Sequence, residues 1–326
     1  MLLILLFVFL LKHQVSCSVG DRYIIFSNCI SDCTTQFDCP ASPFDSGWYF
    51  DECFRCRYSC MWKTVDFINK HFNITPQFYG KWPFIGFQLP LFGFRVPVQE
   101  PASVLFSIMN LFASCYMLQA IRKFPSSCRM KDIWIGYGII GIIVWICSSV
   151  FHCADFWQTE YFDYFSAFAL IIYTFFAATV FVFPRIRACR IRATSVVFLF
   201  GSMLCAFFIR HVTSLWYDFD YGYNMRCCAT FSLLTMLLYV FWMTREYRQR
   251  LGDERDSLRY MRNMLLSGFA GLVFELFDFP PILWILDAHA LFHLVTVPMP
   301  FWMVKLAKSE LIYDQRRAGY LKHHEP

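Results

Sequence analysis

Long uninterrupted apolar stretches fill most of the chain after residue 101, and they restrict its fold more than any other feature. A helix needs about 20 apolar residues to cross the hydrocarbon core of a bilayer, and each stretch has roughly that length. Pro280 and Pro281 divide the last apolar region into two helices, because proline cannot continue a helix. The seven predicted spans lie near residues 102–121, 133–151, 163–183, 194–210, 226–243, 262–279 and 282–304.

The composition agrees with a membrane protein. Hydrophobic residues make up 57% of the chain and charged residues 16%, whereas a soluble domain carries about a quarter charged residues. Phe, Tyr and Trp together account for 20%, which suits helices that face lipid and its interfaces. We therefore predict an all-α membrane protein with a seven-transmembrane helix bundle over residues 102–305, and we exclude a soluble enzyme and a disordered chain.

The amino terminus indicates a secretory protein. Residues 2–11 form an apolar run that is too short to span a bilayer, and small or modest residues follow at 15–18. This pattern predicts a signal peptide over residues 1–17 that is cleaved after Cys17. Because no basic residue precedes the apolar run, an uncleaved anchor is the alternative. In either case the next segment enters the secretory lumen.

A cluster of cysteines follows this leader. Six of the 15 cysteines lie close together, and they are Cys29, Cys33, Cys39, Cys53, Cys56 and Cys60. An even number of cysteines in an exported segment predicts three disulfides, whose connectivity the sequence leaves open; the alternative is a zinc knuckle on Cys53 and Cys56. Asn73 begins an Asn-Ile-Thr sequon and is a predicted glycosylation site. Residues 18–101 are thus expected to form a small disulfide-rich lumenal domain without a long regular helix.

Basic residues gather in alternate loops of the predicted bundle. They follow the first, third and fifth spans and recur near the carboxyl terminus, whereas the loops at 153–162 and 211–225 are acidic or nearly neutral. The positive-inside rule then places the amino terminus in the lumen and a tail at 306–326 in the cytosol. The net charge of +5 therefore reflects sidedness, and no nucleic-acid partner is expected.

Polar and ionisable residues within the spans are few, and they gather at the predicted lumenal ends, where such costly groups are usually functional. Ser148 and His152 are four residues apart and share one face of the second span. His289 and His293 have the same spacing in the last span, and Asp163 opens the third. Three neutral imidazoles can bind zinc tetrahedrally with one position left open for chemistry. Asp163 could then accept a proton, and Ser148 could stabilise a developing oxyanion.

The spacing alone leaves other interpretations open. Ala290 stands where a zincin helix has its glutamate, so the chain is not a zincin. The histidines could instead form a proton relay or a ligand pocket, or bond neighbouring helices. Asp155, three residues after His152, competes with Asp163 for the role of base. Solvated or interfacial positions are expected for Glu275, Asp278, Asp287 and His211.

The whole pattern resembles a known superfamily. Ser148-x-x-x-His152, Asp163 and His289-x-x-x-His293 are similar to the site of the CREST membrane hydrolases, which include alkaline ceramidases and progestin/adipoQ receptors. The cysteine spacing resembles the Per-like branch, the lipid remodelling factors that act after GPI attachment to proteins. Further segments that resemble this branch are 20–22, 58–62, 220–225 and 287–290.

This resemblance implies a zinc-dependent, GPI-specific phospholipase A2-like enzyme of the Golgi membrane, with the endoplasmic reticulum as the alternative compartment. It would hydrolyse the sn-2 acyl ester of GPI anchors attached to proteins, so its partners would be GPI-anchored proteins, their lipid and membrane lipids. The three histidines would bind Zn²⁺ and activate water, Asp163 would take the proton, and Ser148 would help to hold the oxyanion. The alternatives are a receptor or chaperone with a structural metal, and a ceramidase-like amidase.

Overall fold

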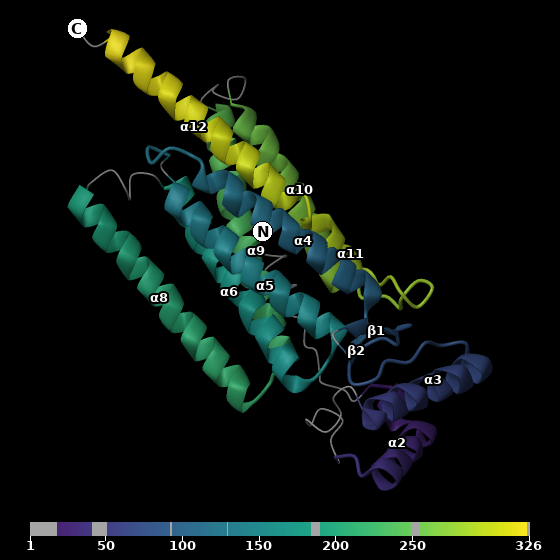
Figure 1. Ribbon diagram of the computed structural model, residues 1–326. Helices are drawn as coiled ribbons and strands as arrows, with labels where there is room; N and C mark the ends of the chain where they lie inside the picture. The colour runs from purple at the N-terminus through teal and green to yellow at the C-terminus, as the bar shows by residue number, and fades with distance from the viewer. Residues whose placement is uncertain are drawn as a thin grey trace.

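The computed structural model describes residues 18–40, 51–91, 93–128, 130–183, 190–248 and 255–324, so the predicted signal peptide lies outside the described residues. The described chain is mostly helical, as predicted, with one antiparallel two-stranded sheet. Before the bundle come η1 (Gly20–Arg22), α2 (Ile24–Phe37), α3 (Glu52–Phe72), β1 (Phe87–Leu91) and β2 (Phe94–Val98). The bundle comprises α4 (Pro101–Arg122), α5 (Lys131–Cys153), α6 (Trp157–Val182), α8 (Arg190–Tyr217), α9 (Tyr221–Arg248), α10 (Asp256–Leu276), α11 (Ala288–Thr296) and α12 (Met299–His324). In Figure 1, α2 and α3 lie at one end of the bundle and the carboxyl terminus lies at the other.

Six helices among the described residues are long and apolar enough to cross a membrane. They are α4, α5, α6, α8 from Ser195, α9, and α11 together with α12 over Ala288–Arg316. α10 occupies the place of the predicted sixth span, but Arg259 and Arg262 near its start make it less apolar. It nevertheless packs against both α11 and α12 (Figure 1). A count of seven spans therefore remains a prediction.

The turn between α5 and α6 is tighter than the sequence indicates. Thr159 donates a hydrogen bond from Oγ1 to the carbonyl oxygen of Ala154 at 2.7 Å, and the same Oγ1 accepts one from the Phe156 N–H at 3.2 Å. These bonds cap the start of α6, so the helix begins at Trp157 and not near residue 163. Asp163 consequently lies well inside α6, where it is only 8% exposed.

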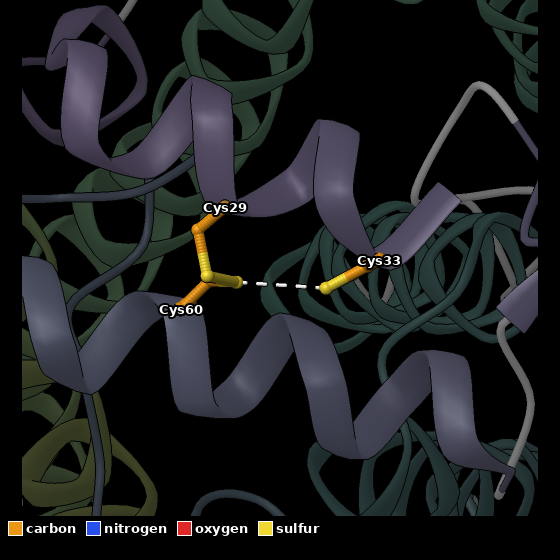
Figure 2. A group of neighbouring side chains, drawn as sticks. All are labelled: Cys29, Cys33 and Cys60. Carbon is orange, nitrogen blue, oxygen red and sulfur yellow. Dashed lines mark hydrogen bonds between the residues drawn. A yellow bond between two sulfur atoms is a disulfide. The ribbon is translucent and has the colours of Figure 1, made fainter. Parts of the chain in front are cut away.

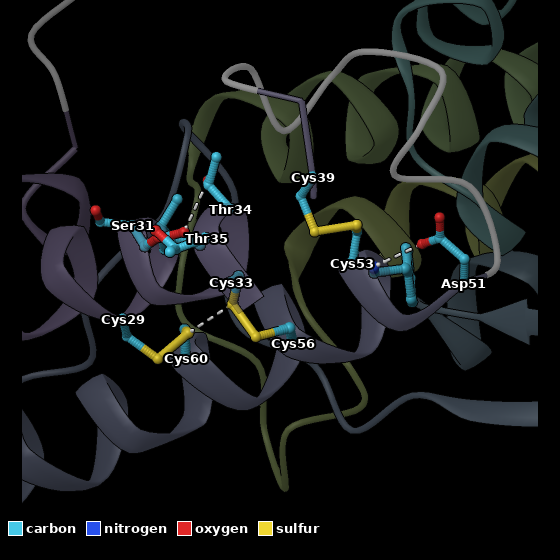
Figure 3. The surroundings of a disulfide bond; sticks show 12 residues. Cys29, Ser31, Cys33, Thr34, Thr35, Cys39, Asp51, Cys53, Cys56 and Cys60 are labelled. Carbon is cyan, nitrogen blue, oxygen red and sulfur yellow. Dashed lines mark hydrogen bonds between the residues drawn. A yellow bond between two sulfur atoms is a disulfide. The ribbon is translucent and has the colours of Figure 1, made fainter. Parts of the chain in front are cut away.

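Three disulfides join α2 to α3 (Figure 3). Cys29 pairs with Cys60, Cys33 with Cys56, and Cys39 with Cys53. The nested order follows from two antiparallel helices: Cys29 and Cys33 of α2 face Cys60 and Cys56 of α3 at helical spacing, and Cys39, two residues after α2 ends, reaches Cys53. The prediction of three disulfides is confirmed, and the zinc-knuckle alternative is wrong. The three sulfur atoms that lie together in Figure 2 belong to two neighbouring disulfides.

The expectation that this region lacks a long helix is wrong, because α3 alone has 21 residues. Cys53 and Cys60 occupy the first half of its buried side and the aliphatic Val65 and Ile68 only the second, so the aliphatic stripe by which amphipathic helices are usually identified is incomplete. Local signals mark both ends of the helix. The side chain of Asp51 accepts a hydrogen bond from the Phe54 N–H at 3.1 Å, and Asn73 ends the helix in the left-handed conformation (φ 54°).

Two backbone hydrogen bonds join the segment between β2 and α4 directly to the end of α5. The N–H groups of Gln99 and Glu100 donate to the carbonyl oxygens of Cys153 and His152, at 3.2 and 3.1 Å. These carbonyls are among the last four of α5, which have no partner within their own helix. The segment between β2 and α4 therefore caps the helix that carries Ser148 and His152.

The loop between α10 and α11 makes a second junction with the cysteine-rich unit. The Ile85 N–H donates to the carbonyl oxygen of Trp284 at 2.9 Å, and the rings of Trp62 and Trp284 meet edge to face at 5.2 Å. Asp278 is exposed, as expected, and it also accepts hydrogen bonds from Trp82 Nε1 at 2.6 Å and Gln77 Nε2 at 2.9 Å. The loop that leads to His289 is thus fixed by residues far away in the sequence.

A buried ion-pair network ties α9, α10 and α12 together far from these junctions. The guanidinium of Arg255 lies 2.5 Å from Glu246 of α9 and 2.9 Å from Glu310 of α12, and its side chain is 8% exposed. The same group stacks over the ring of Tyr313 at 3.8 Å. Because Arg255, at the start of α10, contacts a carboxylate on each of two neighbouring helices, the network holds α10 in the bundle.

We predict that Arg255→Met lowers the free energy of unfolding by about 3–5 kcal/mol, because it removes the buried cation that bridges two buried carboxylates. Thermal unfolding of the purified full-length protein in detergent, followed by tryptophan fluorescence, measures the change. Arg259→Met is the matched control, since Arg259 is exposed on the same helix. If the two variants melt at the same temperature, the network does not contribute to stability.

Candidate metal centre

Three histidines from two separate helices meet near one end of the bundle. His152 belongs to the last turn of α5, while His289 and His293 lie one turn apart on α11. Their ligand nitrogens all lie within 4.8 Å of one another. His152 and His293 are 2% and 3% exposed, whereas the side chain of His289 is 35% exposed. The predicted set therefore comes together and remains accessible from the side of His289.

Two of the three rings are held from behind by carboxylates. His152 Nδ1 donates to Glu100 Oε2 at 2.6 Å, and His289 Nδ1 donates to Glu275 Oε2 at 3.0 Å. Burial raises the pKa of Glu100, but the hydrogen bond from His152 and the nearby Lys81 ammonium group lower it, and the pKa ends below its usual range. A carboxylate behind each ring fixes the tautomer with the proton on Nδ1 and turns the lone pair of Nε2 toward the centre.

The third ring is held by a pair of buried hydroxyl groups. His293 Nδ1 lies 2.9 Å from Ser107 Oγ, and Ser107 Oγ lies 3.0 Å from Ser148 Oγ. Asn110 of α4 donates from Nδ2 to the carbonyl oxygen of His293 at 2.7 Å, which fixes the backbone as well. Ser148 is thus linked to the histidine cluster through Ser107.

The arrangement fits a bound cation. With their Nδ1 atoms held from behind, all three rings present Nε2 to a common point, and the Nε2 atoms of His289 and His293 are 2.9 Å apart. His152 Nε2 is buried and has no hydrogen-bond partner among the described residues. Lone pairs that face each other in a buried site repel unless a proton or metal ion lies between them. Three imidazole nitrogens form a donor set that suits zinc and related transition metals.

Asp163 is buried beside this cluster. From α6 it interacts electrostatically with both His152 and His289. Its competitor Asp155 is engaged elsewhere, because its Oδ2 lies 2.6 Å from the ammonium group of Lys81. Of the two aspartates, Asp163 is therefore the one that interacts with the histidines. Asp155 instead joins the end of α5 to the segment between α3 and β1 through Lys81.

Several expectations for polar residues are corrected by the structure. Glu275 was expected to be solvated but holds His289. Asp287 is 5% exposed and caps α11 by accepting a hydrogen bond from the Ala290 N–H at 2.8 Å. His211 was expected at the interface but is fully buried, with Nε2 bonded to Asn224 at 3.0 Å. Glu275 and His211 find a polar partner on another helix, whereas Asp287 bonds the backbone of the helix that it caps.

Glu100 and Ser107 were not identified from the sequence as functional residues. Glu100 directly precedes the proline that opens α4. An acidic residue at this position is typical of the start of a helix and does not by itself indicate a function. Ser107 is one of several serines in apolar helices, where a serine can simply bond its own backbone. Only the packing of α4 against α5 and α11 gives these two residues their partners.

The fold and site together describe a helical membrane protein with a buried three-histidine centre beneath a disulfide-linked unit. Residues 43–311 match the Per1-like family, and the chain belongs to this family. It is 33% identical over 321 residues to the GPI-specific phospholipase A2-like PGAP3 of Xenopus tropicalis, with 94% of each chain covered.

Other relatives show the same extent of similarity. The chain is 32% identical over 310 residues to GPI-specific phospholipase A2-like PGAP3 of Homo sapiens, which covers 91% of this chain and 90% of the relative. It is 29% identical over 321 residues to Protein PER1 homolog of Schizosaccharomyces pombe, which covers 95% and 92% respectively. No solved structure matches the chain.

We predict that Glu275→Gln weakens zinc binding by about 10- to 100-fold, because an amide no longer fixes the His289 ring as a carboxylate does. Metal affinity of the purified protein, measured by competition with a chelating dye, tests this. Asp256→Asn is the matched control, since Asp256 is an exposed acid at the other end of the same helix. Equal zinc affinity in both variants would show that Glu275 does not support a metal ligand.

Proposed function

We propose that this protein remodels the lipid of GPI anchors by zinc-dependent hydrolysis of the sn-2 acyl ester. The observation that carries the proposal is the convergence of three imidazoles, each held at Nδ1 by a partner from another segment. The names of the relatives, GPI-specific phospholipase A2-like, support the choice of substrate and bond. The substrate would be a GPI-anchored protein presented by the membrane.

In this proposal His152, His289 and His293 hold the zinc ion. A zinc ion bound by three imidazoles lowers the pKa of water to about 7 and polarises a carbonyl group. Asp163, buried beside the cluster, accepts the proton that the attacking water loses and delivers it to the leaving alkoxide.

The hydroxyl chain behind His293 orients Ser148. When Nε2 of His293 faces the metal, its Nδ1–H donates to Ser107 Oγ, and Ser107 in turn donates to Ser148 Oγ. The hydrogen of Ser148 is then directed away from Ser107. We infer that Ser148 donates it to the ester carbonyl oxygen as negative charge develops there.

The location of the centre suits a lipid substrate. The rings of Trp157, at the start of α6, and Trp216, near the end of α8, meet edge to face, and Trp157, Trp216 and the neighbouring Tyr217 are 37%, 56% and 85% exposed. Exposed aromatic residues at the ends of apolar helices are typical of the membrane–water interface. The centre lies near this same end of the bundle, at the last turn of α5, so an acyl ester at the level of the headgroups would be within reach.

We further propose that this end faces the lumen of the Golgi or of the endoplasmic reticulum and that the tail at 306–326 is cytosolic. The disulfides at the same end support this orientation, because disulfides persist in an oxidising compartment. In this orientation α10 also crosses the membrane, as the sixth span in chain order, and brings the total to seven. The buried ion pairs of Arg255 offset its less apolar character.

We predict that Asp163→Asn lowers the release of fatty acid by about 10²- to 10⁴-fold while zinc remains bound, because the asparagine cannot accept the proton. His289→Ala should abolish both zinc binding and release. Purified protein acting on a GPI-anchored reporter, followed by mass spectrometry of the lipid, measures release, and elemental analysis measures zinc. His71→Ala, at an exposed histidine of α3, is the control and should retain both.

These results separate the enzyme from its alternatives. A receptor or chaperone with a structural metal would bind zinc yet release no fatty acid from any variant. An amidase would release fatty acid from ceramide instead of from the reporter. In cells, normally remodelled GPI lipid in the presence of His289→Ala alone would contradict the proposal.

Glycosylation tests the orientation. Asn73 is exposed at the end of α3, and we predict that it carries a glycan that an endoglycosidase removes, with a corresponding change in gel mobility. Asn73→Gln and Thr75→Ala should both abolish the change, and Thr75→Ala does so without altering the residue that ends the helix. An unmodified sequon in a correctly inserted protein would argue against a lumenal cysteine-rich unit.

A further inference from the structure

Two apolar segments outside the helices lie at the end of the bundle that carries the metal centre. The first covers residues 83–91, in which Gln88 is the only polar residue, and the second is the loop at 279–286, which has no charged residue. A backbone hydrogen bond from the Ile85 N–H to the carbonyl oxygen of Trp284, at 2.9 Å, joins them. Figure 1 shows β1 and β2 between the helices of the bundle and α3. The two segments therefore form one continuous surface.

Large apolar side chains of this surface are exposed. Phe87 and Leu89 lie two residues apart on β1, and therefore on one face of the strand, and they are 48% and 45% exposed. In the loop, Leu283 is 80% exposed. An apolar surface of this kind is unfavourable in water and usually marks a site of interaction. We call the exposed apolar residues of both segments the apolar rim, and they are Ile85, Phe87, Leu89, Ile282, Leu283 and Ile285.

The backbone of the loop is strained where it presents Leu283. Leu283 and Trp284 both have the left-handed conformation, with φ of 55° and 62°, which is costly for bulky side chains. The Ile282 N–H donates to the carbonyl oxygen of Leu286 at 2.8 Å, and the Trp284 ring packs edge to face on Trp62. These contacts impose a tight turn that contains Leu283. Strain of this kind persists only where the surrounding structure fixes it, and it is common in functional segments.

The position of the rim indicates what covers it. Most exposed residues of α2 are polar, and these are Ser27, Asn28, Ser31, Asp32, Thr35 and Gln36. The two segments of the rim instead adjoin membrane spans, because β2 ends at Val98 shortly before α4 begins at Pro101, and the loop leads directly into α11. The rim thus continues the apolar surface of the spans at the level of their ends. A lipid leaflet is the apolar phase next to it.

We propose that the apolar rim is a lipid-binding surface that inserts into the leaflet at this end of the bundle. The insertion is shallow, because the open edges of a hairpin and an irregular loop carry backbone groups that cannot be satisfied in the hydrocarbon core. Amphipathic helices bury their apolar faces about 5–10 Å into the boundary between headgroups and acyl chains, and we expect a similar depth for the rim. The partner is a phospholipid leaflet, recognised by its apolar layer and not by the charge of its headgroups.

A rim in this position would affect access to the metal centre. His289 follows Leu283 by six residues and is the accessible histidine of the three, with its side chain 35% exposed. Lipids displaced by the inserted rim would then lie next to the open side of the centre. This consequence rests on the proposed function, whereas the insertion itself does not.

Depth-dependent fluorescence quenching tests the insertion directly. A genetically encoded fluorescent amino acid replaces Leu283 or Leu89, one at a time, in the full-length protein reconstituted into phosphatidylcholine nanodiscs. Spin-labelled lipids carry the quencher near the carboxyl end or near the methyl end of the acyl chain, and iodide quenches from the water. We expect both probes to be quenched most strongly by the label near the carboxyl end and to be shielded from iodide.

Two further positions calibrate the measurement. Met203 is 62% exposed in the central part of α8, and a probe there should be quenched most strongly by the label near the methyl end. Ser31 is exposed on α2, and a probe there should be quenched by iodide and by neither lipid. All four probes replace exposed side chains, so the fold should be retained, and thermal unfolding at the wild-type temperature verifies this.

A charge within the rim provides a second test. With the probe at Leu89, Leu283→Asp should reduce quenching by the lipid labels and expose the probe to iodide, because a carboxylate is unfavourable below the headgroups. Leu283→Met is the matched control and should leave both forms of quenching unchanged. The effect of one segment on a probe in the other tests whether the two act as one surface.

The outcomes either support or overturn the proposal. Quenching by iodide without quenching by lipid, at Leu283 or at Leu89, would overturn it. Shielding from both iodide and lipid would also overturn it, because another protein or a second copy of the chain would then cover the rim. If the lipid labels quench both probes but no fatty acid is released from GPI substrates, the proposed hydrolysis fails while the rim remains. Release of fatty acid without lipid quenching would overturn the rim alone.

Discussion

Three imidazole nitrogens with lone pairs directed at one another are unfavourable in a buried site unless each ring is held from behind and a cation lies between them. This requirement explains the arrangement of the bundle around the centre. Glu100 before α4 holds one ring, Ser107 within α4 holds another, and Glu275 at the end of α10 holds the third. The histidines come from only two helices, but their geometry depends on four segments that must pack together.

The same requirement accounts for a helix that is otherwise poorly suited to a bilayer. α10 is less apolar than its neighbours, yet it supplies Glu275 to the centre. Its position is fixed at both ends by polar contacts. Arg255 joins it to α9 and α12 through buried ion pairs, and Ser267 donates to the carbonyl oxygen of Val295 on α11. Electrostatic and hydrogen-bonding contacts thus replace part of the apolar character that positions the other helices.

Much of this site could be predicted from the sequence because charges within apolar helices are rare. His152, His289 and His293 stood out for that reason, and their four-residue spacings predicted shared faces correctly. The partners of the rings could not be predicted in the same way. A serine such as Ser107 is ordinary in an apolar helix, and the acids at 100 and 275 lie at helix ends, where solvation is the simplest expectation. The helix α3 was missed because cysteines occupy, in its first half, the positions where aliphatic residues would have revealed it.

The hydrogen bonds from Gln99 and Glu100 to the end of α5 mean that the bundle is not a separable module. A chain cut before α4 would uncover the terminal carbonyls of α5 and would lose the carboxylate behind His152 in the same step. The dipeptide is also the point at which the fold of the cysteine-rich unit and that of the bundle meet. The centre is therefore complete only when the cysteine-rich unit and the bundle have both folded and docked. A newly made chain then acquires its full set of ring partners at the last stage of its assembly.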